Sequence, residues 1–223
     1  MEYEPTWESL RKHVVPEWFD GAKFGIRVAW GLFSVPGWAP LTGELTKVVA
    51  KEGWAGWFAK NPYAEWYLNS IKIRGSPSHQ HHVKTYGKNF SYDDSVPVFN
   101  EASRNWDTDD WVDLFKKCGA RYVVPWAKFH DGFLLWPSAH PNPRKERYCA
   151  ERDIIGELAE SIRVSGMRMG IYYSGGLDWS FNDAVIKDFT DLFKAIPEDF
   201  SACRRTRHTP AHKSVYEGGA PRK

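Results

Sequence analysis

The chain has 223 residues, of which 42% are hydrophobic and 26% charged, and its formal net charge at pH 7 is +2. This length and composition predict one folded domain with a substantial core and exclude a disordered or fibrous protein. No apolar run approaches the ~18 residues of a membrane-spanning helix. The N-terminal sequence lacks a basic region followed by an apolar run, so we expect no secretory signal and a cytoplasmic protein.

The cysteine and tryptophan contents indicate what kind of site this protein has. The three cysteines, Cys118, Cys149 and Cys203, are scattered and form no CxxC pair, which argues against a disulfide framework and a zinc site. We therefore expect no metal and no cofactor. The 12 tryptophans are many for a chain of this size, and they suggest that some aromatic rings line a ligand site.

The first half of the chain predicts one strand and little other regular structure. Residues 1–22 form a helical or irregular lead-in, and residues 23–31 form a strand that ends before Pro36. Residues 32–106 are rich in Trp, Gly, Pro and Asn and show weak periodicity. Within them we expect helical pieces only at 64–72 and 80–86.

From Asp107 the pattern becomes regular. Asp107 or Thr108 caps a helix that ends near Gly119, and residues 121–128 form a strand in which Pro125 predicts a bulge. The same order repeats, because Asp153 caps an apolar-periodic helix, Gly166 ends it, and a strand follows at 167–174.

Repeated helix, glycine and strand units predict parallel strands, here three neighbours at 23–31, 121–128 and 167–174. The fold class is α/β, as part of a (β/α)8-like barrel, whose chemistry lies at the C-terminal ends of the strands. Eight strands take about 250 residues, so this chain holds less than half of such a barrel. After the third strand we expect only a short helix at 185–195.

The composition changes sharply at residue 201. Residues 201–223 hold six basic side chains and one acidic, a net charge of +5 that leaves −3 for residues 1–200. The segment lacks Leu, Ile, Phe, Trp and Met, which predicts disorder. A basic segment can bind nucleic acid, but this one lacks interleaved aromatic residues, and we expect no nucleic-acid partner.

Four segments stand in a distinctive order: WGLFSVP at 30–36, EWY at 65–67, KFHDGF at 128–133 and YYSGGLDW at 172–179. As a series they resemble the α-L-fucosidases of glycoside hydrolase family 29, over about residues 7–198. The resemblance implies a retaining glycosidase that releases L-fucose from fucosylated oligosaccharides or glycoconjugates. It also implies an Asp nucleophile and a Glu acid/base supplied later in the chain. It does not indicate an oligomeric state.

The resemblance assigns four residues to a fucose pocket. Glu65 and Trp66 match a Glu-Trp pair that holds sugar hydroxyls, His130 matches the second histidine of a Lys-His-His-Asp-Gly-Phe motif, and Tyr172 matches a pocket tyrosine. Carboxylate and imidazole groups bond hydroxyls, and aromatic faces pack on the apolar side of a sugar. We expect these side chains to converge near the C-terminal ends of the strands.

The chain departs from the family pattern in three places. Ala29 and Phe129 stand where the family has histidines, and each lost hydrogen bond weakens sugar binding by about 1–3 kcal/mol. The nucleophile motif is absent, and the resemblance ends near residue 198, where the composition changes. A frameshift or truncation after residue 198 accounts for both, so residues 1–200 are interpreted as the N-terminal portion of the barrel and 201–223 as an out-of-frame tail.

The catalytic carboxylates therefore remain unassigned. Retaining hydrolysis needs two carboxyl groups roughly 5 Å apart. The candidates are Asp131, Asp178 and Glu65. Asp131 and Asp178 follow strand ends, but the family pattern makes both structural. A fucosidase activity and a non-catalytic, fucose-binding pseudoenzyme or decayed gene product thus stay open as alternatives. Three histidines at 79, 81 and 82 have no carboxylate or Cys at ligand spacing, and we interpret them as solvated surface residues and not as a metal site.

Overall fold

The computed structural model describes residue 4, residues 6–181, residues 185–187 and residue 191. The basic segment 201–223 and most of the predicted helix 185–195 lie outside the described residues. In chain order the helices are α1 (Trp7–Leu10), α2 (Glu17–Ala22), η1 (Leu32–Ser34), α3 (Leu45–Ala59), η2 (Ala64–Trp66), α4 (Tyr67–Lys72), α5 (Pro77–Tyr86), η3 (Tyr92–Ser95), α6 (Val96–Ser103), α7 (Thr108–Lys117) and α8 (Ile154–Val164).

A parallel sheet lies at the centre of the described chain. Its strands are β1 (Gly25–Val28), β2 (Tyr122–Lys128), β3 (Arg168–Met169) and β4 (Tyr172–Tyr173). β2 pairs with β1 on one side, and β3 and β4 each pair with β2, all in parallel. The three predicted neighbouring parallel strands are confirmed, although the third is divided into β3 and β4.

Pro125 does not interrupt β2. It stays in register opposite Val28 of β1. The irregularity lies further along, where the register between β2 and β4 shifts between Trp126 and Lys128. The predicted bulge is therefore misplaced by one to three residues, because proline removes one N–H donor but its φ is compatible with a strand.

Helices α7 and α8 form as the sequence predicts. The Asp107 carboxylate accepts the N–H of Asp109 at 2.9 Å, and the Asp153 side chain accepts the N–H of Gly156 at 2.8 Å. Each side chain thus satisfies one of the unpaired N–H groups of the first turn. The glycine that follows each helix, Gly119 or Gly166, has a φ of +85° or +79°, a left-handed conformation that few other residues adopt.

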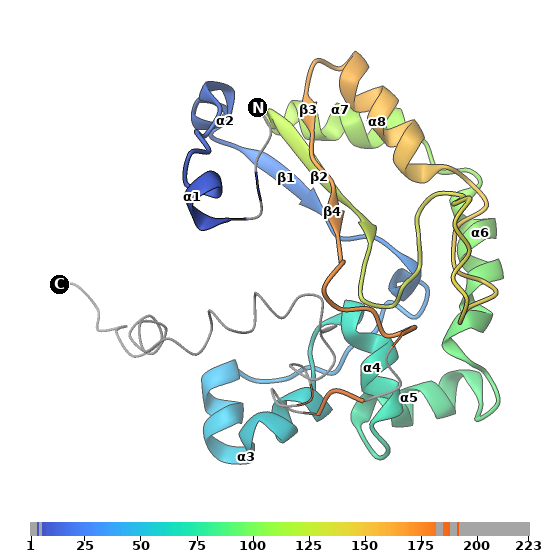
Figure 1. Cartoon of the computed structure of the whole chain (residues 1–223). Helices are drawn as coiled ribbons and strands as arrows, with labels where there is room; N and C mark the ends of the chain where they lie inside the picture. The colour runs from blue at the N-terminus through green and yellow to red at the C-terminus, as the bar shows by residue number, and fades with distance from the viewer. Residues whose placement is uncertain (1–3, 5, 182–184, 188–190, 192–223) are drawn as a thin grey trace.

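Different helices pack on the two faces of the sheet. Helices α7 and α8 lie together on one face (Figure 1), where Val123 and Ile162 are fully buried. Tyr122 points to the opposite face, where α2 covers the N-terminal end of the strands through Trp18 and Phe19, with ring centroids 6.0 Å and 5.6 Å from Tyr122. The N-terminal end of this second face is thereby partly covered, and its C-terminal end faces helices α3, α4 and α5 (Figure 1).

The long segment between β1 and β2 holds more helix than its sequence predicts. The helical pieces at 64–72 and 80–86 are confirmed as η2 with α4 and as α5. Helices α3 and α6 are not predicted. Gly53 inside α3 has a non-helical φ of +70°, so this helix is kinked and its hydrophobic periodicity is broken there.

The interpretation of the three histidines in α5 as solvated side chains is wrong. His82 is buried, and its ring bonds the Tyr67 hydroxyl at 3.1 Å and the Phe90 carbonyl at 2.8 Å. His81 stacks on Trp38 with ring centroids 4.1 Å apart. Only helical spacing combined with knowledge of which face of α5 packs inward would have placed His82 in the interior.

No helix in the part of the chain that the structure describes is both long enough and apolar enough to cross a lipid bilayer.

Candidate active site

A continuous wall of rings lies at the C-terminal ends of β2 and β4. The His130 ring is 5.8 Å from Trp66 and 3.9 Å from Phe129, measured between centroids, and Phe129 is 6.2 Å from Tyr172. Trp179 contacts both Trp66 and His130, at 5.3 Å and 5.5 Å. Three of the four predicted site residues therefore line one wall, although the ring of Phe129 separates His130 from Tyr172.

Glu65 belongs to the same wall by its position in η2, directly before Trp66. Its side chain is half-buried and makes no hydrogen bond or ion pair with any described residue. A carboxylate with no partner in the described part of the chain remains able to accept sugar hydroxyls. That Glu65 contacts fucose stays a prediction.

The backbone and side chain of His130 are both fixed by the segment that follows β4. The Trp179 N–H donates to the His130 carbonyl at 2.7 Å, and His130 Nδ1 lies 2.6 Å from Ser174 Oγ. Gly132 permits the close approach of the two segments, since a Cβ there would lie 2.7 Å from an Asp178 carboxylate oxygen. This position also has a φ of +76°, which favours glycine.

Burial determines the charge of His130. Desolvation lowers its pKa from 6.5 to about 4. A hydrogen bond to the Leu177 backbone partly opposes this shift and raises the pKa, and the nearby charges have smaller effects, since Lys128 lowers the pKa and Asp178 raises it. At neutral pH the imidazole is therefore uncharged, with one nitrogen protonated and the other able to accept a hydrogen bond.

A buried ion pair joins β2 to the segment that holds His130. Lys128 Nζ lies 2.7 Å from Asp178 Oδ2 and donates to the Ser174 carbonyl at 2.6 Å, and both charged side chains are mostly buried. Asp178 also accepts the backbone N–H of Ser180 at 2.9 Å. Because both carboxylate oxygens have partners, Asp178 is placed to organise the site and not to attack a substrate.

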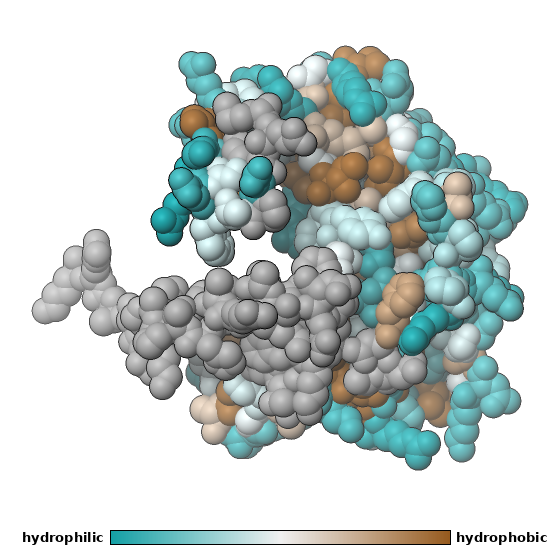
Figure 2. Space-filling model, viewed as in Figure 1, coloured by the Kyte–Doolittle hydropathy of each residue, from teal (hydrophilic) through white to brown (hydrophobic). Residues whose placement is uncertain are grey.

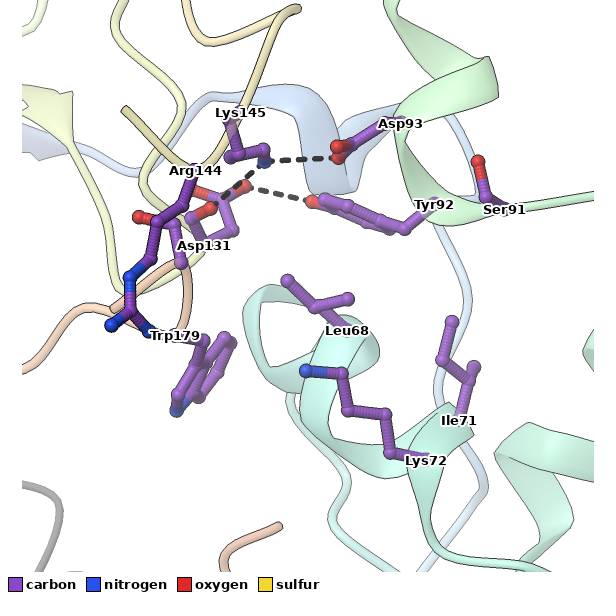
Figure 3. Close-up of a pocket in the computed structure, with 11 residues that line it drawn as sticks. Leu68, Ile71, Lys72, Ser91, Tyr92, Asp93, Asp131, Arg144, Lys145 and Trp179 are labelled. Atoms are coloured by element: carbon purple, nitrogen blue, oxygen red, sulfur yellow. Dashed lines mark hydrogen bonds and ion pairs between the residues drawn. The ribbon is translucent and has the colours of Figure 1, made fainter. Parts of the chain in front are cut away.

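Asp131 is also held by protein partners. It lies on the wall of a pocket of about 350 Å³ beside the ring wall, drawn in Figure 3. Its carboxylate accepts the Tyr92 hydroxyl at 2.8 Å and the Phe133 N–H at 3.1 Å. Burial raises the pKa of Asp131. A fully buried carboxyl with two donors fits the structural role that the sequence predicts.

The two departures from the fucosidase pattern have visible consequences. Phe129 is buried and stacks on Trp126 with centroids 4.3 Å apart and planes 6° from parallel. Its ring gives apolar packing where a histidine would offer a hydrogen bond. Ala29 is exposed just after β1 and presents only a methyl group. Both positions thus lack a group that bonds a sugar hydroxyl.

The sequence reasoning missed the contributions of Ser174, Lys128 and Trp179. All three stand inside the segments that carry the family resemblance, but no residue type or spacing shows that Ser174 and Trp179 contact His130 or that Lys128 pairs with Asp178. The described residues contain no group of three or more His, Cys, Asp or Glu side chains arranged to hold a metal ion.

Parallel strands joined through helices, with a ring-lined wall at their C-terminal ends, define part of a (β/α)8-type enzyme barrel. The family model described as alpha-L-fucosidase matches residues 1–204. The chain belongs to the α-L-fucosidase family. The match continues past residue 198, the predicted end of the resemblance.

Individual relatives agree. The chain is 34% identical to the α-L-fucosidase of Dictyostelium discoideum, over 84% of this chain and 36% of that protein. It is 36% identical to the tissue α-L-fucosidase of Bos taurus, over 86% of this chain and 36% of that protein. The solved structure of Thermotoga maritima α-fucosidase in complex with fucose has a TM-score of 0.75 at 44% identity.

That comparison covers 97% of this chain and 46% of the Thermotoga chain. The chain therefore spans about a third of the curated relatives and just under half of the solved structure that it matches.

Proposed function

We propose that this chain supplies the fucose-binding wall of a retaining α-L-fucosidase active site. The ring wall that holds Trp66, His130 and Tyr172, at the C-terminal ends of the strands in a member of this family, carries the proposal. The chemistry fits a monosaccharide, because flat rings pack against the C–H face of a sugar while Glu65 and the neutral His130 accept its hydroxyls.

The mechanism requires two further groups. A retaining glycosidase needs a carboxylate nucleophile and a second carboxyl group that protonates the leaving oxygen, roughly 5 Å apart. Asp131 and Asp178 each have both oxygens bonded to protein groups. We assign the nucleophile and the acid/base to neither of them. The described residues thus bind and orient the fucosyl unit, and the bond-breaking carboxylates come from elsewhere in the complete active site.

Sugar binding without hydrolysis is the second candidate function for this chain by itself. The observation that favours it is the same saturation of Asp131 and Asp178 by protein partners. The two candidates share one pocket and differ only in whether a glycosidic bond is broken.

Hydrolysis of an aryl α-L-fucoside tests the assignment. Purified chain, checked for folding by near-UV circular dichroism, is expected to release no phenol above the rate without protein. Without a nucleophile and an acid/base, each missing function lowers the rate by orders of magnitude. Turnover that disappears in Asp178→Asn or Asp131→Asn would contradict the assignment and identify a catalytic carboxylate.

A further inference from the structure

We infer that Ser174 fixes His130 as the tautomer that carries its proton on Nδ1, so that Nε2 accepts a hydrogen bond from a hydroxyl of the bound sugar. Ser174 is a positioning residue in this account, because it acts through His130. The inference rests on the proposed function for the sugar contact, whereas the tautomer itself follows from the geometry alone.

The Ser174 hydroxyl has a single proton to donate. Ser174 Oγ donates to the Leu177 carbonyl at 2.7 Å. A carbonyl oxygen has no proton, so the serine must be the donor in this bond. Its hydroxyl proton is thereby used, and the lone pairs of Oγ remain free to accept.

Ser174 Oγ also bonds the His130 ring. His130 Nδ1 lies 2.6 Å from the same Ser174 Oγ. If Nδ1 were unprotonated, Ser174 would have to donate there, and its oxygen would face the Leu177 carbonyl at 2.7 Å with no proton between them. Ser174 is buried, so such an unpaired contact would be costly. Only the Nδ1–H tautomer satisfies all three groups at once.

The segment that carries Ser174 is held rigidly next to β2. Lys128 donates to the Ser174 carbonyl at 2.6 Å and pairs with Asp178 at 2.7 Å, so the strand end that carries Ser174 is tied to β2. The Leu177 carbonyl and the Asp178 carboxylate belong to the same short segment. The buried ion pair therefore holds the serine and its acceptor in place relative to the imidazole.

The tautomer of His130 determines the direction of its hydrogen bond with the sugar. In the neutral Nδ1–H tautomer, Nε2 is an acceptor only, and among the described residues the one side chain that bonds the His130 ring is Ser174, on Nδ1. It pairs with a sugar hydroxyl that donates. A fluorine or a methoxy group in place of that hydroxyl has no proton to give, so the site discriminates against such analogues.

Nitrogen-15 spectroscopy of histidine-labelled full chain at pH 7 tests the inference. The signals of His130 are assigned by their loss in His130→Gln. We expect Nδ1 to resonate as a protonated nitrogen and Nε2 as an unprotonated one. In Ser174→Ala the two nitrogens should shift toward averaged values, and in the matched control Ser138→Ala, a serine whose side chain bonds the His140 backbone, they should not.

A protonated Nε2 in the wild-type chain would overturn the inference, whatever the behaviour of the variants. Addition of L-fucose then tests the sugar contact separately from the tautomer. A change in Nε2 with Nδ1 still protonated supports the sugar contact. A fixed Nδ1–H tautomer with no response to L-fucose leaves the tautomer standing and contradicts both the sugar contact and the proposed fucose pocket.

Discussion

At the scale of single residues, the site contains a buried neutral histidine and a buried ion pair. His130 is kept neutral because desolvation outweighs the hydrogen bond to the Leu177 backbone and the attraction of Asp178. Lys128 and Asp178 are buried as a pair, with Lys128 Nζ 2.7 Å from Asp178 Oδ2. A site with one neutral acceptor and one internal ion pair suits an uncharged ligand such as a monosaccharide.

The lowered pKa of His130 makes stability depend on pH. The folded chain holds the neutral ring, while the unfolded chain takes up a proton below pH 6.5. Stability is therefore fully present above pH 6.5 and falls as the pH decreases toward about 4. We expect a loss on the order of 2–3 kcal/mol across this window, absent in His130→Asn. Urea unfolding of both proteins at several pH values measures it, and identical slopes would contradict the neutral histidine.

Lys128→Met should be strongly destabilising. It removes one member of a pair whose side chains are 6% and 15% exposed, and it leaves the Asp178 carboxylate without its cation. The expected loss is about 3–5 kcal/mol. The matched control is Lys47→Met, whose pair with Glu44 has side chains 77% and 67% exposed and should be worth less than about 1 kcal/mol. Equal unfolding midpoints for the two variants would refute the role of the buried pair.

At the scale of elements, the described fold depends on the packing of α7 and α8 against the sheet. Ile162 of α8 is completely buried between the two helices and Val123 of β2. The helix ends are fixed by side-chain caps and left-handed glycines, and the apolar faces then meet. This layer positions the strand ends that carry the site.

Ile162→Ala tests this packing. Removal of a fully buried side chain should lower the free energy of unfolding by about 2–5 kcal/mol, through lost burial and a remaining cavity. Val164→Ala on the same helix is the control, because Val164 is 79% exposed and its loss should be worth less than about 0.5 kcal/mol. Chemical denaturation gives both values, and a tolerated Ile162→Ala would show that α8 does not anchor the sheet.

The sequence predicts the regular elements well because their signals are local. Asp107 and Asp153 are caps, and Gly119 and Gly166 end their helices, as the spacing of polar and apolar residues indicates. Helix α3 escapes prediction because Gly53 kinks it. The burial of His82 and the anchoring of His130 by Ser174 depend on contacts between segments far apart in the chain, which no local pattern encodes.

At the scale of the whole molecule, the described sheet is open. β1 and the β3–β4 segment form its two edges, and Ile171 and Tyr173 are more than half exposed. Figure 2 shows hydrophobic surface over the region where Figure 1 places the strands. Solved fucosidases that match nearly all of this chain are about twice as long. The open sheet corresponds to a partial barrel, and the ring wall to a partial pocket.

The affinity for L-fucose tests the central claim most directly. Isothermal titration of the folded chain should give weak, saturable binding on the order of millimolar, since Ala29 and Phe129 contribute no hydrogen bonds. Glu65→Gln should weaken it at least several-fold, and Glu101→Gln, an exposed residue of α6, should leave it unchanged. Absence of binding by the folded wild-type chain, or equal affinity in Glu65→Gln, would contradict the assignment of this wall to fucose.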